Sequence, residues 1–323
     1  MKTLRWLFAL VIAGALSRAP ASFAQAAPPA APAARVALIP LPTAGDVAYG
    51  PDVKNRLDFW RAPSTRPTPV VIFIHGGGFV AGDKAEARFD PQVAACLNAG
   101  ISVVSINYRF LSANTALPAI LRDGARAVQF VRSMAGAWNL DRSRVAAFGE
   151  SAGASLSLWL AFHDDLADPK SADPVAREST RLTCAGAKAP QCSFDPVRWE
   201  MLFGADVVTR LGGTYRSPTN LGFATDAELR GPAGAAVRAD CDFVGQITPD
   251  DPPVFLDASG RSVALTTTNQ LLHHPRHALQ LHIHCRDAGV ADVAIIPAYD
   301  IAPAVGAPQT LREFLFQHLG VAH

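Results

Sequence analysis

A serine between two glycines stands where a short apolar run gives way to a helical pattern. The stretch AAFGESAGAS contains Gly149, Ser151 and Gly153, which form a G-x-S-x-G motif. The two glycines permit a tight strand-to-helix turn, and this turn lifts the serine hydroxyl above the edge of a sheet near the positive end of a helix. We therefore predict that Ser151 is a nucleophile.

A run of three glycines follows an earlier apolar segment. The stretch VIFIHGGGFV places His75 and Gly76 to Gly78 after that segment, so no glycine side chain blocks approach to the backbone. Backbone N–H groups can stabilise the tetrahedral anion of acyl transfer, and losing one such donor commonly costs about a hundredfold or more in rate. We predict an oxyanion hole made by Gly77, Gly78 and Ala152.

The elements that position these motifs follow an alternating order. Apolar runs of strand length are separated by segments of helical period, which predicts an α/β fold with a mostly parallel central sheet and helices on both faces. The expected strands are 57–60, 70–74, 102–107, 144–148, 182–185, 254–257 and 293–296, and the expected helices are 118–134, 152–162, 275–288 and 308–319.

Between residues 195 and 251 the periodicity weakens into glycine, proline and mixed polar residues. A long stretch of this kind inside an enzyme is usually functional, which predicts a lid-like or substrate-side insertion. An ordinary decorated crossover is the alternative. The catalytic domain is expected to span residues 48–323, after an Ala/Pro-rich leader over residues 25–47 that lacks hydrophobic periodicity.

The first residues are typical of a secretory signal peptide. Lys2 and Arg5 precede the apolar run from Leu7 to Leu16, and small residues stand ahead of Gln25, so we predict a signal over residues 1–24 and a secreted or periplasmic protein. An N-terminal membrane anchor is the alternative. Loss of this segment lowers the formal net charge from +1 to −2, which does not favour nucleic-acid binding.

The cysteines and histidines do not indicate a metal site. The chain has five cysteines, and none has CxxC spacing; Cys184 and Cys192 allow a short-loop disulfide, with buried free thiols as the alternative. Histidines gather late in the chain, at His277, His282 and His284, but no HExxH pattern accompanies them. We therefore expect no metal and no other cofactor.

Together these motifs resemble the HGGG-bearing esterases of the α/β-hydrolase fold, in particular the hormone-sensitive-lipase-like and the feruloyl or acetyl xylan esterase-like groups. The likeness runs from about residue 48 to 319 and depends mainly on HGGGFVAGDK and GESAG, with support from SINYRF, DDPPVFL and LREFLFQHLG. The resemblance implies a carboxylic ester as substrate, either small or carbohydrate-linked.

The sequence departs from that family in its last third. Family members generally carry the triad acid in an HG-x-x-D stretch after a late strand and the histidine in a G-x-x-H turn after the final strand. The corresponding stretches here are LDASGRSVALTTTNQLLHHPRHA and AYDI. Asp257 lies slightly early and is an alternative acid, while His318 falls in the terminal amphipathic helix, where a structural role is expected.

An exchange of loops would restore the chemistry, because the loops after the last two strands open on the same edge of the sheet as Ser151. His273 and His274 lie in the loop that normally holds the acid, and Asp300 lies in the loop that normally holds the base. Triads are defined by roles rather than by chain order. We predict a Ser151, His274, Asp300 triad, preferring His274 to His273 because it would cap the following helix. In the alternative, the histidines only cap a helix and Asp300 only a turn.

These residues favour an exported serine carboxylic-ester hydrolase that acts through an acyl-enzyme. The competing hypothesis is a hydrolase-fold protein that kept its serine turn, lost its base and binds a carbohydrate or another ligand without turnover. The glycine motifs alone do not separate the two hypotheses, and the oligomeric state stays open.

Overall fold

The computed structural model describes residues 36–322, apart from the side chains of Thr214 and Arg216. The predicted signal peptide and residues 25–35 of the predicted leader lie outside the described residues. The described residues, 36–322, cluster as one compact unit. None of the helices in the described part of the chain is long and apolar enough to cross a membrane.

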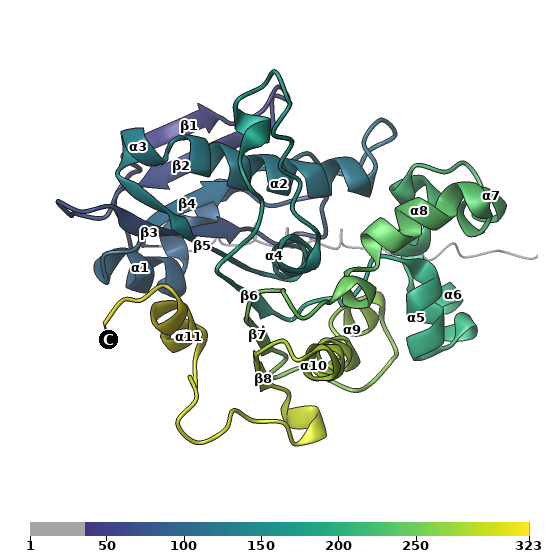
Figure 1. The fold of residues 1–323 in the computed structure, drawn as a ribbon. Helices are drawn as coiled ribbons and strands as arrows, with labels where there is room; N and C mark the ends of the chain where they lie inside the picture. Colours follow the sequence, from purple (N-terminus) through teal and green to yellow (C-terminus); the bar gives the residue numbers. More distant parts are fainter. Residues whose placement is uncertain (1–35, 323) are drawn as a thin grey trace, which may run out of the picture. The chain divides into compact units, whose positions relative to one another are not determined.

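The unit is built around one eight-stranded sheet with the order β1-β2-β4-β3-β5-β6-β7-β8 (Figure 1). The first two strands pair in the antiparallel sense and the other six run parallel to one another. The strands are β1 (Ala44–Ala48), β2 (Arg56–Trp60), β3 (Thr68–Ile74), β4 (Ser102–Ile106), β5 (Leu140–Glu150), β6 (Cys184–Lys188), β7 (Val254–Asp257) and β8 (Asp292–Ile295). The predicted α/β class with a mostly parallel sheet is confirmed.

Helices cover both faces of this sheet, which explains why every residue of β3 and β4 is buried (Figure 1). Alternate side chains of β3 enter two separate cores. Val70, Ile72 and Ile74 pack in the core with α2 (Leu117–Ser133), α4 (Ala152–Phe162) and α10 (Arg276–Ala288). Val71 and Phe73 pack in the core with α1 (Pro91–Asn98) and α11 (Leu311–His318).

Strand β1 begins in the segment 25–47 that was expected to be leader and ends at Ala48. Its sequence, AGDVA, carries no apolar periodicity. It forms an edge strand because β2 offers it a ladder partner, with Val47 opposite Leu57. A pairing of this kind depends on the neighbouring strand rather than on the propensity of the segment itself.

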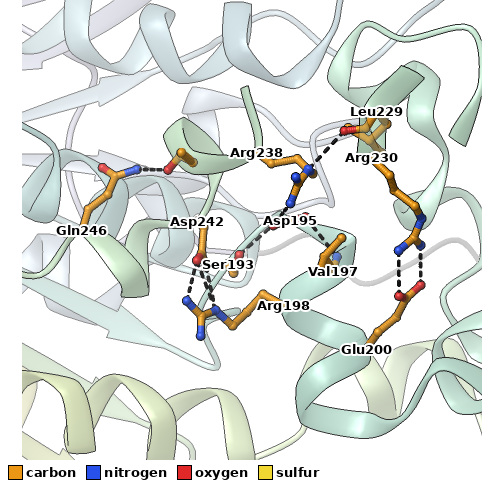
Figure 2. Close-up of polar contacts among 11 residues, drawn as sticks. Ser193, Asp195, Val197, Arg198, Glu200, Leu229, Arg230, Arg238, Asp242 and Gln246 are labelled. Carbon is orange, nitrogen blue, oxygen red and sulfur yellow. Dashed lines mark hydrogen bonds and ion pairs between the residues drawn. The ribbon is translucent and has the colours of Figure 1, made fainter. Parts of the chain in front are cut away.

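The weakly periodic stretch between β6 and β7 is a helical insertion. It contains α5 (Pro196–Phe203), α6 (Ala205–Leu211), η3 (Gly213–Arg216), η4 (Pro218–Leu221), α7 (Asp226–Arg230), α8 (Pro232–Cys241) and η5 (Phe243–Gln246). Ion pairs tie its helices together: Arg198 to Asp242 at 2.6 Å and Arg230 to Glu200 at 2.6 Å (Figure 2). Short helices gave only a weak pattern in the sequence because each buries little apolar surface by itself.

The five cysteines are all free thiols, and all are buried. The disulfide that the sequence allowed between Cys184 and Cys192 is therefore absent, and the alternative of buried free thiols holds. Burial raises the pKa of these thiols; the pKa of Cys96, for example, is raised to about 12. A buried thiol with a raised pKa is a poor nucleophile, so none of the five is a candidate for catalysis.

Candidate active site

Ser151 sits on a strained turn between β5 and α4. Its backbone has φ 55° and ψ −119°, a conformation that a residue with a side chain rarely adopts. The flanking glycines explain how the turn fits: a Cβ on Gly149 would lie 2.3 Å from the carbonyl oxygen of Ile74, and one on Gly153 would lie 2.0 Å from the same oxygen. The turn therefore lies against the central strand β3, and only glycine fits at positions 149 and 153.

The glycine loop approaches this turn from the end of β3. A Cβ on Gly76 would lie 3.0 Å from the carbonyl oxygen of Glu150 and 3.7 Å from the Cβ of Ser151. Gly77 and Gly78 have φ of +102° and +61°, which are left-handed conformations. Within residues 36–322 their N–H groups donate to no backbone carbonyl outside regular helices and strands, which leaves them available to a ligand.

Two further features support an anion site beside Ser151. Ala152 is the first residue of α4, and the N–H of a first helical residue has no partner inside its helix. The start of the glycine loop is held in place by Tyr108, whose hydroxyl donates to the carbonyl oxygen of His75 at 2.7 Å. The predicted donors Gly77, Gly78 and Ala152 thus lie on the two segments that meet at the serine.

The histidine that faces Ser151 is His273. Its Nε2 lies 2.8 Å from the Ser151 Oγ, and its Nδ1 lies 3.0 Å from the carbonyl oxygen of Asn269. A carbonyl oxygen only accepts hydrogen bonds, so Nδ1 carries the proton and the unprotonated Nε2 faces the serine hydroxyl. This tautomer is the one that can accept the Ser151 proton.

Burial lowers the pKa of His273 below its usual value, and the charge of Arg261 lowers it further. The Asn269 carbonyl and the charge of Glu150 act in the opposite direction. Arg261 and Glu150 form an ion pair of 2.8 Å with each other, so part of their effect on the ring cancels. A lowered pKa keeps His273 neutral, and able to accept a proton, at neutral pH.

His274, the histidine that we predicted as the base, does not face Ser151. Its Nε2–H donates to the carbonyl oxygen of Val263 at 3.1 Å, and its Nδ1 accepts from the N–H of Arg276 at 3.0 Å. The side chain is buried, with 4% of its surface exposed. Nδ1 thus holds the start of α10 and Nε2 ties it to the loop before α9 (Thr268–Leu272), which is the structural role that the sequence left open for this pair.

A signal for this difference was present in the sequence. Thr267 and Gln270 form a capping box at the start of α9 (Thr268–Leu272), the T-x-x-Q pattern of a helix N-terminus. This short helix ends at His273, which is its C-cap, so the chain turns between His273 and His274. Neighbouring side chains on either side of such a turn point in different directions, and only the first reaches the serine.

Asp300, the predicted acid, is not brought to either histidine. It ends the single turn η6 (Pro297–Tyr299) in a left-handed conformation with φ 54°, and a bridge between Ile296 and Ile301 folds this loop back on itself. Asp257 is engaged elsewhere, since its carboxylate accepts from the N–H and the hydroxyl of Ser259 at 2.8 and 2.6 Å. The group that orients His273 is therefore a backbone carbonyl, and the arrangement is a serine–histidine dyad.

No group of three His, Cys, Asp or Glu side chains within the described residues is arranged to hold a metal ion. His277 is fully buried and makes polar contacts with Cys192, at 3.3 Å from its Sγ, and with the carbonyl oxygen of Leu271. His282 pairs with Asp292 at 2.6 Å. These late histidines hold helices in place.

The segment that contains the glycine loop and Ser151 is similar to known proteins. The BD-FAE family matches residues 57–181, a range that contains the glycine loop and Ser151 but ends before His273. Among curated proteins, the chain is 34% identical over 113 residues to a probable isoprenylcysteine alpha-carbonyl methylesterase of Oryza sativa and 34% identical over 116 residues to the esterase LipQ of Mycobacterium tuberculosis. These matches span about a third of this chain, 34% and 35%, and about a quarter of the relatives, 26% and 27%.

Solved structures align over far more of the chain. An acetyl ester-xyloside bifunctional hydrolase from Caldicellulosiruptor lactoaceticus matches with a TM-score of 0.58 and 23% identity, covering 82% of this chain and 88% of that one. The chain has the α/β-hydrolase fold. A truncated carbohydrate esterase from gut microbiota shares this fold, with a TM-score of 0.60, 17% identity and coverage of 85% and 95%. The predicted resemblance to HGGG-type esterases of the α/β-hydrolase fold is confirmed.

Proposed function

We propose that this α/β-hydrolase chain is a serine carboxylic-ester hydrolase that acts through an acyl-enzyme. The observation that carries the proposal is the 2.8 Å contact between the Ser151 Oγ and the His273 Nε2, in the tautomer required of a base. The esterase names of its relatives and structural neighbours support the same reaction class.

In the proposed mechanism, His273 accepts the proton of Ser151 as its oxygen attacks the ester carbonyl carbon. The carbonyl oxygen becomes an anion that accepts hydrogen bonds from Gly77, Gly78 and Ala152. Collapse of this intermediate breaks the ester bond, and the His273 imidazolium returns its proton to the departing alcohol. A water molecule then attacks the acyl carbon and gives a proton to His273. Collapse of this second intermediate breaks the bond to the Ser151 oxygen, which takes the proton back from His273, and the acid is released.

Replacing a carboxylate by the Asn269 carbonyl has a chemical consequence. The carbonyl fixes the ring and its tautomer, but it carries no full charge to stabilise the imidazolium. The dyad therefore gives up part of the electrostatic help that a triad supplies. We expect turnover with esters whose alcohol leaves readily, such as aryl acetates, and slower turnover with alkyl esters.

The substrate proposed is a small or carbohydrate-linked ester. Support comes from the printed descriptions of the neighbours, an acetyl ester-xyloside hydrolase and a carbohydrate esterase. Export to the periplasm or medium is proposed from residues 1–24 alone, and N-terminal sequencing of the mature protein recovered from those fractions tests it.

The test of the function uses a fluorophosphonate probe, which reacts only with an activated serine. We expect the wild type to be labelled, Ser151→Ala to be unlabelled and His273→Gln to be labelled about a hundredfold to ten-thousandfold more slowly. His274→Gln is the matched control, because glutamine retains an N–H donor for the Val263 carbonyl and the residue does not face Ser151. Labelling of His273→Gln at the wild-type rate would remove His273 as the base, and an unlabelled wild type would favour ligand binding without turnover.

A further inference from the structure

Tyr215 places a phenol directly over the glycine loop. A Cβ built on Gly78 would lie 2.2 Å from the Tyr215 hydroxyl oxygen and 3.2 Å from its ring carbon Cζ. The tyrosine hydroxyl thus occupies the space into which a side chain at position 78 would project. Gly78 is one of the proposed oxyanion donors, so the insertion places this phenol beside a proposed donor.

The position of Tyr215 is set by packing. It belongs to η3, where its N–H donates to the Gly212 carbonyl at 3.1 Å. Its ring packs against an apolar cluster that is separate from the two main cores and contains Trp199, Phe203, Val208, Leu211 and Leu271. Leu271 lies in α9, the helix that ends at His273. One cluster therefore contacts both Tyr215 and the helix that ends at His273.

The insertion that carries Tyr215 is cross-linked by ion pairs on several of its helices. Arg198 pairs with Asp242, and Arg238 lies 3.3 Å from Asp195, the N-cap of α5 (Figure 2). These pairs connect α5 to α8 and to the turn after it. A cross-linked support favours a fixed position for η3 over a freely moving one.

The Tyr215 hydroxyl can donate a hydrogen bond to a ligand. Among the side chains that the structure describes, it makes no hydrogen bond with a protein group, although the residue is half-buried. Burial raises the pKa of this phenol above its usual value, so the hydroxyl keeps its proton at neutral pH, where the lowered pKa of His273 keeps the imidazole neutral. The hydroxyl is therefore free to donate to a ligand bound beside the glycine loop.

We propose that the Tyr215 hydroxyl donates a hydrogen bond to the oxyanion of the tetrahedral intermediate, beside the N–H groups of Gly77, Gly78 and Ala152. This inference rests on the proposed esterase function. It makes the insertion a source of a catalytic group rather than only a cover for the site.

The test is Tyr215→Phe, which removes the hydroxyl and keeps the ring in the apolar cluster. We expect kcat for an aryl acetate to fall about tenfold to a hundredfold or more while KM changes little, because the hydrogen bond forms with an oxygen that is an anion only in the transition state. The rate of fluorophosphonate labelling should fall in parallel. Tyr299→Phe is the matched control, since Tyr299 is also partly exposed, lies in η6 and packs against the main core rather than in the cluster that contains Tyr215.

The outcomes separate this inference from the proposed function. If the wild type turns over esters and the kcat of Tyr215→Phe lies within about twofold of the wild-type kcat, the role of Tyr215 is overturned and the esterase function is left intact. A higher KM at unchanged kcat would also overturn it, because the hydroxyl would then bind the substrate equally in its ground state. A wild type that neither turns over esters nor is labelled would refute both proposals.

Discussion

Gln191 connects α4, which follows Ser151, to the loop that holds His273, the proposed base. Its side-chain N–H donates to the Leu272 carbonyl at 2.8 Å, one residue before His273. Its side-chain oxygen lies 3.0 Å from the Ser155 hydroxyl oxygen and accepts from that hydroxyl, which also lies 3.1 Å from the Ser151 carbonyl oxygen. The perturbation we choose is Gln191→Met, which keeps the length of the side chain and removes both hydrogen bonds.

The magnitude follows from what these bonds hold. Gln191 is 5% exposed, so methionine leaves the Leu272 carbonyl without its donor in a nearly dry place, which costs about 1 to 3 kcal/mol of unfolding free energy. The larger effect is on position. A displacement of about 1 Å in a catalytic group can cost about a hundredfold in rate, so we expect kcat to fall about tenfold to a hundredfold. KM should change little because the glycine loop is untouched.

The assay combines initial rates on an aryl acetate with urea unfolding. Gln129→Met is the control: Gln129 is 6% exposed in α2 and its side-chain N–H groups lie near the Leu166, Ala176 and Glu178 carbonyls, the last at 2.9 Å. Both variants should lose similar unfolding free energy, and only Gln191→Met should lose activity. If the two variants lose stability alike and both keep wild-type kcat, the reasoning that Gln191 positions His273 is refuted.

Three further predictions concern pH and thiols. Because burial lowers the pKa of His273 and the neutral ring is the active form, the acid limb of kcat/KM should have its midpoint below 6.5; Arg261→Gln, which removes a nearby positive charge, should move it upward in a pH–rate series. Burial also lowers the pKa of His277 to about 3, so the unfolded chain binds more protons than the folded chain between about pH 6.5 and pH 3. The stability that depends on this group is therefore complete above that window and is lost as the pH falls through it. In urea unfolding, the unfolding free energy of His277→Gln should decline less steeply with falling pH than that of the wild type. A thiol-reactive colorimetric reagent should modify none of the five buried cysteines in the native protein and all five after denaturation, whereas any native disulfide would lower the second count.

The elbow and the glycine loop were visible in the sequence because each is a short contiguous motif beside an apolar run, and α4 was predicted with the boundaries that it has, 152–162. The reason that the elbow needs glycine is tertiary: Gly149 and Gly153 lie against Ile74 of β3, the strand that pairs with β5. The buried strands were predictable because they are continuous apolar runs, as in β3 and β4. By contrast, β1 was missed, because its only reason to be extended is the partner strand beside it.

The sequence by itself determined that a serine is lifted at the end of a central strand, that glycine N–H groups stand beside it, and that its partner lies outside the usual place in the chain. Only the tertiary structure decided which histidine that partner is. His273 and His274 are adjacent and chemically identical, and the choice depends on where a short helix ends and on how the insertion packs against it. The tertiary structure also decided that Asp300 stays apart and that a backbone carbonyl orients the base, because these distances join segments that no local pattern relates.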